Sequence, residues 1–178
     1  MALPQQATGR NQKRGGFALS RFFGLLAGIW LLSASYPAVA QDRFVRVTGL
    51  SDVNFGLITN FGVDARRSQS LCLFSGRPGL GYNVRAFGSG LGGVFTLASG
   101  PDRLKYDVQW NMNAGQTSGT QLTPNATLTG LISNAAQQTC SNGPPTSASL
   151  ILIIRATELT GAAGGNFSGT LNLIIGPE

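Results

Sequence analysis

The chain has 178 residues, a formal net charge of +6 and no histidine. The absence of histidine excludes a Ser-His-Asp triad and deprives zinc of its commonest nitrogen ligand. Only seven carboxylates occur, and none has a second carboxylate or a base at a spacing that would bring the two together. We therefore expect a protein that is not an enzyme and that needs no cofactor and no metal ion.

The N-terminal part of the chain has the three parts of a secretory signal peptide. Four basic residues precede an apolar stretch over residues 22–32, and residues 38–40 form the small-x-small site Ala-Val-Ala. The apolar stretch is too short to span a bilayer core of about 30 Å, which argues against a membrane anchor. We predict a cleaved signal peptide over residues 1–40 and an exported domain over residues 41–178 with no membrane span.

Removing this leader changes the charge argument. The mature chain keeps nine of the thirteen basic residues and all seven acidic ones, so its net charge is +2. Arg66 and Arg67 form its only adjacent basic pair, and no basic cluster is interleaved with aromatic residues. We expect no nucleic-acid partner.

Cys72 and Cys140 are the two cysteines of the chain. In an oxidising compartment outside the cytoplasm, two cysteines favour one disulfide over two free thiols. The alternatives, a metal pair or a catalytic thiol, need helper side chains, and the sequence offers no histidine. We predict a disulfide between Cys72 and Cys140.

The mature chain shows the period-2 alternation of β-strands in most of its apolar segments. Near its N-terminus, "RFVRVTGL" and "DVNFGLI" predict one or two strands, and "SLCLF" around Cys72 predicts another. The next predicted strand is "YNVRAF", which places Tyr82, Val84 and Ala86 on one face. It is followed by "VFTL", with Phe95 as its first inward residue.

The second half of the chain continues this pattern. The run "LKYDVQW" predicts one strand that buries alternate residues up to Trp110, which we interpret as a core aromatic rather than a sugar platform. A shorter strand is predicted in "ATLTGLI", and "SLILIIR" is apolar on both parities, as in a strand covered on both faces. One helical turn is predicted in "ATELTGAAG". The last strand is predicted in "FSGTLNLIIGPE", with Leu171, Leu173 and Ile175 on its buried face.

Segments rich in glycine, proline and asparagine separate these strands, which indicates an all-β sandwich or barrel. The segment "GSGLGG" formally matches the dinucleotide-binding fingerprint. That fingerprint requires a helix directly after it, and here a strand is predicted next. We predict a turn at this position, and a long polar loop over residues 111–123.

Several of these segments together resemble the spore coat protein U domain, which is shared with subunits of the archaic chaperone–usher pili of Gram-negative bacteria. The resemblance covers about residues 44–178. Its most specific parts are Asn54-Phe55-Gly56, the strand from Tyr106 to Trp110, and the terminal run "FSGTLNLIIGPE".

The resemblance implies an immunoglobulin-like β-sandwich that lacks its final strand and is completed by a donor strand. It implies a structural subunit of a secreted pilus that supports adhesion or biofilm formation. The implied partners are a periplasmic pilus chaperone, an outer-membrane usher and neighbouring pilin subunits. The subunit would pass through the periplasm and end in a cell-surface fimbrium.

In that arrangement the last predicted strand is one wall of a hydrophobic groove. The residues expected to line the groove are Val53, Phe55, Leu171, Leu173 and Ile175. By the same resemblance, the C-terminal Glu178 is expected to contact the chaperone.

Two alternatives stay open in the sequence. Family subunits carry a donor segment before the first strand, often with a cysteine, whereas here only about fourteen residues separate Gln41 from Phe55. Either this subunit donates no strand and lies at or near the fibre tip, or it has a short donor made of Phe44, Val45, Val47 and Leu50. The other alternative is a complete, self-folding β-sandwich that is secreted as an adhesin or carbohydrate-binding module.

Overall fold

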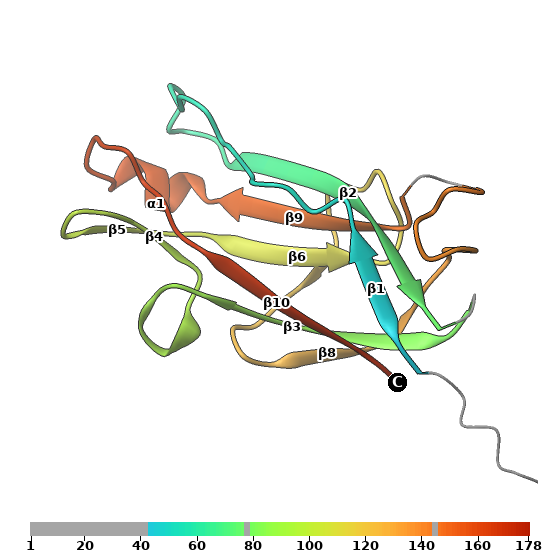
Figure 1. Cartoon of the computed structure of the whole chain (residues 1–178). Coiled ribbons are helices and arrows are strands. Elements are labelled where there is room, and N and C mark those ends of the chain that lie inside the picture. The colour runs from blue at the N-terminus through green and yellow to red at the C-terminus, as the bar shows by residue number, and fades with distance from the viewer. Residues whose placement is uncertain (1–42, 77–78, 144–145) are drawn as a thin grey trace, which may run out of the picture. The chain divides into compact units, whose positions relative to one another are not determined.

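The computed structural model describes residues 43–76, 79–143 and 146–178. The predicted signal peptide over residues 1–40 lies outside these ranges. Within them the chain forms antiparallel β-sheets, with one short α-helix and one 3₁₀ turn (Figure 1). The predicted all-β class is confirmed.

The larger sheet contains five antiparallel strands. Their spatial order is β1 (Val45–Thr48), β2 (Ala65–Ser75), β9 (Ala148–Ile154), β6 (Asp107–Asn111) and β7 (Thr120–Gln121). The long strand β2 pairs with β1 through its C-terminal residues, where Thr48 lies opposite Cys72. It pairs with β9 through its N-terminal residues, up to Leu71.

The smaller sheet contains three strands in the order β10 (Leu171–Pro177), β3 (Gly81–Gly88) and β8 (Thr127–Ile132). β10 pairs along its whole length with β3, from Leu171 opposite Gly88 to Pro177 opposite Tyr82. The other elements are the hairpin β4 (Thr96–Ser99) and β5 (Asp102–Lys105), the 3₁₀ turn Leu91–Gly93, and α1 (Ala156–Thr160).

Both sheets contribute side chains to one hydrophobic core, as in a β-sandwich. All seven residues of β9 are buried, because this strand lies between β2 and β6 and is covered on both faces. From the smaller sheet, Tyr82, Val84 and Ala86 face the same core and are buried. The continuous burial predicted for β9 and the alternation predicted for β3 are therefore confirmed.

A buried hydrogen bond joins the two sheets. The indole N–H of Trp110 on β6 donates to the hydroxyl of Tyr82 on β3 over 2.9 Å, and the two rings meet edge to face. Each side chain is only 1% exposed, so Trp110 is a core aromatic as predicted. Burial raises the pKa of the Tyr82 hydroxyl, and the bond from Trp110 opposes that shift.

A second, smaller cluster surrounds the predicted disulfide. Cys72 and Cys140 are bonded, with Cα atoms 5.9 Å apart. Phe44 and Phe74 pack beside them with ring centroids 5.7 Å apart. The disulfide therefore ties the segment before β9 to the half of β2 that pairs with β1.

Of the one or two strands predicted from "RFVRVTGL" and "DVNFGLI", the first forms β1, whereas the second segment forms none, because residues 49–64 contain no strand. Val53 and Phe55 still pack against the core, which accounts for their alternation with polar neighbours. Gly49 has a φ of +83°, and there the chain turns away from β2. The alternation of apolar and polar residues thus predicted correctly which side chains are buried. It does not predict a strand by itself, because a strand also needs a neighbouring strand to bond to.

The strand predicted from "LKYDVQW" is divided into β5 and β6. The break lies at Tyr106, whose N–H donates to the carbonyl of Phe95 over 3.1 Å. Leu104, Tyr106, Val108 and Trp110 nevertheless share the buried face, as predicted. The segment "GSGLGG" forms the predicted turn, and the polar stretch 111–123 contains the two-residue strand β7.

Replacing Tyr82 by Phe removes the acceptor of the buried Trp110 N–H. We expect Tyr82→Phe to lower the free energy of unfolding by about 1–3 kcal/mol. Tyr106→Phe is the matched control, because Tyr106 is also buried but its hydroxyl has no hydrogen-bond partner among the described residues. Urea unfolding of the purified chain, refolded in vitro at low concentration and followed by Trp110 fluorescence, measures both variants, and equal losses in the two would contradict the expectation.

Removing the disulfide is expected to lower the free energy of unfolding by more than Tyr82→Phe does. Cys72 and Cys140 are 68 positions apart, and closing such a loop stabilises a folded chain by about 4 kcal/mol in the chain-entropy model. The double variant Cys72→Ser/Cys140→Ser should show this loss as a lower urea midpoint, with a somewhat steeper slope because its unfolded chain is less compact. A midpoint equal to that of the oxidised wild type would refute it.

Candidate strand-binding groove

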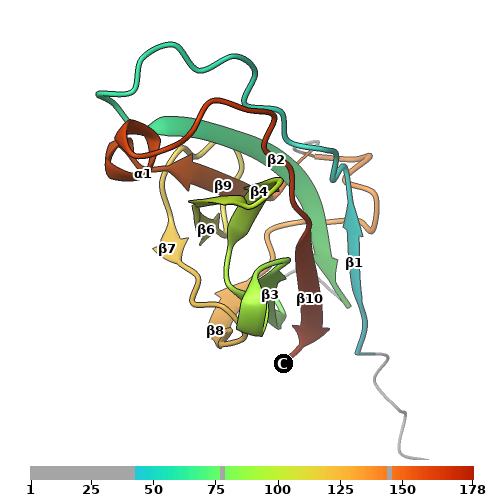
Figure 2. The same cartoon turned by 90° about the vertical axis from the view of Figure 1, so that its left-hand side faces the viewer.

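A groove with a volume of about 1400 Å³ runs between two segments that are far apart in the sequence. One wall consists of residues 50–58, which follow β1, and the other consists of residues 162–173, which lead from α1 into β10. Leu152 and Ile154 of β9 and Leu159 of α1 form part of its floor. Both walls run along the same side of the sandwich (Figures 1 and 2).

β10 presents a half-covered apolar face to the core. Leu171, Leu173 and Ile175 are half-buried against it, whereas Ile174 on the opposite face is 52% exposed. β3 pairs with one edge of β10, and no strand in the described ranges pairs with the other. The outer edge of β10 therefore offers backbone N–H and C=O groups to a further strand.

The facing wall is apolar chain that belongs to no strand. Val53 and Phe55 are half-buried and contact the core, and both line the groove. At the end of this wall, the side-chain oxygen of Asn54 accepts the N–H of Gly56 over 2.7 Å. Gly56 has a φ of +70°, so a tight turn ends the extended part of the wall.

A charged cluster holds α1, whose Leu159 lines the groove. The Arg155 guanidinium lies 2.6 Å from the Asp107 carboxylate and 3.0 Å from that of Asp64. Asp64 also accepts the N–H of Ala156 at the start of α1 over 2.9 Å. This backbone bond, reinforced by Arg155, lowers the pKa of Asp64, and the bond to Asp107 raises the pKa of Arg155.

The structure brings four of the five predicted groove residues together. Val53 and Phe55 line one wall, and Leu171 and Leu173 line the other. Ile175 lies further along β10, where it packs against the core without lining the groove.

Several residues that line the groove were not predicted from the sequence. The loop 162–165 reads in sequence as an ordinary small-residue turn, yet it lines the groove beside Leu159. Leu104 and Tyr106 were predicted to face inward. The alternation of apolar and polar residues does not show which of the inward residues line a groove. Both line the groove, and burial raises the pKa of the Tyr106 hydroxyl.

Glu178 lies beyond the end of β10. Its backbone N–H donates to the carbonyl of Gly81 over 3.0 Å, and its side-chain carboxylate accepts the N–H of Gly130 over 3.1 Å. These contacts link β10 across β3 to β8. A contact between Glu178 and a chaperone stays a prediction.

The possible donor residues belong to the chain's own sandwich. Val45 and Val47 lie in β1, opposite Ser75 and Leu73 of β2. Phe44 packs against the disulfide cluster, and Leu50 lines the groove. To act as a donor, this segment would have to leave β2.

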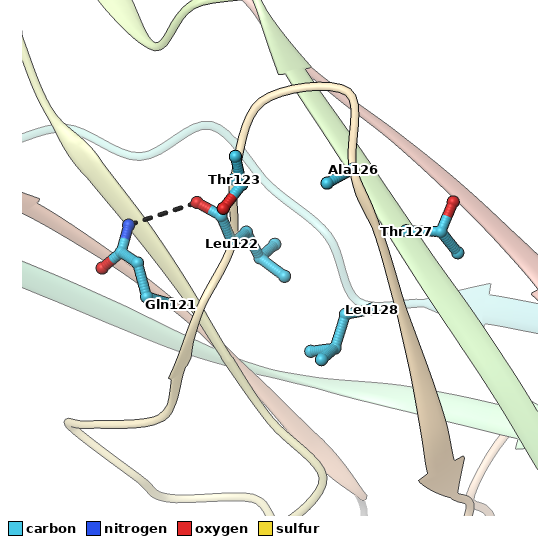
Figure 3. A pocket seen from close by; sticks show the side chains of 6 residues that line it. All are labelled: Gln121, Leu122, Thr123, Ala126, Thr127 and Leu128. Carbon is cyan, nitrogen blue, oxygen red and sulfur yellow. Dashed lines mark hydrogen bonds between the residues drawn. The ribbon is translucent and has the colours of Figure 1, made fainter.

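A second, much smaller pocket of about 160 Å³ lies beside the connection from β7 to β8 (Figure 3). The Gln121 amide donates there to the carbonyl of Leu122 over 3.2 Å. The lining of this pocket includes two threonine hydroxyls and no titratable side chain. Its lining residues are Gln121, Leu122, Thr123, Ala126, Thr127 and Leu128.

Within residues 43–76, 79–143 and 146–178, no group of three or more His, Cys, Asp or Glu side chains could hold a metal ion. In the same ranges, no helix combines the length and the apolar character needed to cross a membrane.

No family model matches the sequence, and no curated protein matches it. Among solved structures, the chain is similar to one described as "Chaperone-tip adhesin complex is vital for synergistic activation of CFA/I fimbriae biogenesis", with a TM-score of 0.46 and 14% sequence identity. The likeness covers 76% of this chain and 41% of the other, so this chain spans less than half the length of that neighbour.

The lowered pKa of Asp64 predicts an acid-dependent contribution to stability. Because its pKa is lower in the folded chain, the contribution is fully present above the unfolded value and is lost as pH falls through the folded value. Asp64→Asn should therefore lower the urea midpoint at neutral pH, and this deficit should shrink below about pH 4.

Asp102→Asn is the control for this titration, since the exposed Asp102 makes no ion pair within the described residues. Urea midpoints across the acid range should show little change for Asp102→Asn. A deficit of Asp64→Asn that stays constant as the solution is acidified would contradict the assignment.

Proposed function

We propose that this chain is a structural subunit of a secreted chaperone–usher pilus, assembled by donor-strand complementation. The observation that carries the proposal is the uncovered edge of β10 beside an apolar groove with an extended opposite wall. A strand laid in this groove would pair its backbone with β10 and bring alternate side chains onto Leu171 and Leu173. In this proposal the sandwich is immunoglobulin-like and lacks one strand, which the partner supplies.

The composition of β10 supports association at its edge. Ordinary domains discourage pairing at such edges with charged residues or proline, whereas β10 carries no charged residue and its only proline, Pro177, is its last residue. Each Leu-sized donor side chain that becomes fully buried stabilises the complex by about 1.5–3 kcal/mol. A donor with several such side chains would complete the core that Leu171 and Leu173 leave half-covered.

The resemblance of residues 44–178 to the spore coat protein U domain supplies the partners of this proposal. A periplasmic chaperone would lend its strand after export, and the outer-membrane usher would receive the complex. A neighbouring pilin subunit would then replace the chaperone's strand. The finished fibre would stand on the cell surface and support adhesion or biofilm formation.

We further propose that this subunit accepts a strand and keeps β1 for itself. β1 pairs with β2 over four residues, and Phe44 beside it packs against the disulfide cluster. Donating this segment would break those contacts and open a second edge on β2. A minor or tip-proximal position in the fibre follows from this proposal.

Folding autonomy tests the proposed function. The full chain is expressed for export to a Gram-negative periplasm, with and without its cognate chaperone. We expect degradation or aggregation of the subunit alone, and recovery as an equimolar complex when the chaperone is present. A stable, cooperatively melting monomer that forms no chaperone complex would refute the pilin function and favour a self-folding adhesin or carbohydrate-binding module.

Charges placed on the groove face of β10 should abolish chaperone capture. In the double variant Leu171→Asp/Leu173→Asp, a donor strand would have to bury carboxylates without partners, which is strongly unfavourable. Ile174→Asp is the matched control, because Ile174 lies on the same strand but its side chain is 52% exposed on the other face.

Co-purification with a tagged chaperone measures both variants. Loss of capture only in the double variant is the expected result. Capture of the double variant at the wild-type level would show that the groove assignment is wrong.

A further inference from the structure

Residues 50–56 of the groove wall run beside β2 without forming a backbone ladder with it. β1 pairs with β2 only as far as Thr48 opposite Cys72, and the chain turns away at Gly49. From Ala65 to Leu71, β2 pairs with β9 on one edge, and no described strand pairs with the other edge. The position of this wall must therefore come from side chains.

At the start of the wall, the side chain of Gln69 on β2 makes the hydrogen bonds that a paired strand would otherwise make. Its amide nitrogen donates to the carbonyl of Ser51, and its amide oxygen accepts the N–H of Ser51, each over 3.1 Å. The Ser51 hydroxyl donates to the same oxygen. A primary amide thus satisfies both backbone groups of Ser51, as a residue of a neighbouring strand would. Gln69 itself also lines the groove.

Arg67 of β2 holds the other end of the same wall. Its Nε donates to the carbonyl of Asn54 over 3.2 Å, and its Nη2 donates to the carbonyl of Phe55 over 2.8 Å. The guanidinium carbon lies 6.0 Å from the centre of the Phe55 ring, within cation–π range. The turn from Asn54 to Gly56 brings both carbonyls within reach of one guanidinium.

We propose that Arg67 and Gln69 are positioning residues that hold this wall ready for the incoming donor strand. The inference rests on the proposed function, because a donor strand is what the wall would meet. Strands joined by a ladder lie about 4.8 Å apart, and side chains as long as those of Arg and Gln hold the wall away from β2 instead. Val53 and Phe55 consequently face the groove rather than extend the β1–β2 sheet.

A wall fixed in advance lowers the ordering cost of donor binding. Without the two side chains, the segment would keep its apolar contacts through Val53 and Phe55 but lose its fixed distance from β10. The donor would then have to order this segment on arrival. The two residues therefore raise the affinity for a donor by fixing the wall that the donor meets.

The variants Arg67→Ala and Gln69→Ala, alone and combined, test this proposal in the complex with the co-expressed chaperone. Arg66→Ala is the matched control, because Arg66 is the adjacent arginine of β2 and also donates to a backbone carbonyl, that of Thr117, outside the groove. The readout is the fraction of disulfide-bonded subunit that co-purifies with the tagged chaperone. Counting only disulfide-bonded subunit excludes chains that have not been oxidised, and the hydrogen-exchange measurement below detects a general loss of structure.

We expect the combined variant to bind the chaperone about tenfold more weakly, which corresponds to about 1.4 kcal/mol, and its co-purified fraction to fall accordingly, while Arg66→Ala stays at the wild-type level. Equal binding of wild type and the combined variant would overturn the inference and leave the proposed function intact. Failure of the wild type itself to bind would refute the proposed function, and the inference with it.

Hydrogen exchange of the same complexes distinguishes positioning from a general loss of structure. Amides of residues 50–56 should exchange about tenfold faster in the combined variant, and those of β9 should keep their wild-type rates. Unchanged exchange in the wall would contradict the proposal. Faster exchange in β9 as well would also contradict it, because the two side chains would then stabilise the whole sandwich.

Discussion

The uncovered backbone edge of β10 is the constraint around which the domain is organised. β3 pairs with the backbone of one edge of this strand along its full length. The inward side chains of β10 pack against the core, which is covered on the β3 side and open on the other. Leu171 and Leu173 are therefore half-buried although they share the inward face with core residues. The same side chains contribute both to the fold and to the candidate binding surface, so stability and recognition are coupled in this groove.

β2 connects two halves of the domain that are held in different ways. Its C-terminal half pairs with β1, carries the disulfide through Cys72 and packs against the Phe44 cluster. Its N-terminal half pairs with β9, and among the described residues it is hydrogen-bonded to the groove wall through the side chains of Gln69 and Arg67. Covalent and ladder contacts therefore hold one end of β2 to its neighbours, while side-chain bonds join its other end to the wall.

The elements that sequence predicted best are those whose burial is complete. Tyr82, Val84 and Ala86 alternate cleanly because the core covers one face of β3, and β9 is apolar throughout because it is covered on both faces. The pattern failed at residues 52–58, where Val53 and Phe55 alternate because of the groove and not because of a ladder. The pattern also could not predict the break between β5 and β6 at Tyr106. A strand can change its hydrogen-bonding partner while the same side chains remain on its buried face.

The candidate site was predicted in part for the same physical reason. Resemblance to a family pointed to Val53, Phe55, Leu171 and Leu173, whereas Ile175 was misplaced because alternation gives a face but not the extent of an opening. The loop 162–165 and the side chains of Gln69 and Arg67 could not be found from periodicity. Their positions depend on contacts between segments distant in sequence, such as Arg67 with the carbonyls of Asn54 and Phe55.

Different contacts hold the two walls of the groove. The Arg155 pairs with Asp64 and Asp107 connect α1, from which one wall begins, to β6 and to the segment before β2. The other wall is hydrogen-bonded to the amide of Gln69 and to the guanidinium of Arg67. In the proposed complex, a wall held in this way would already be in place when the donor strand arrives, so that binding would carry a smaller ordering cost.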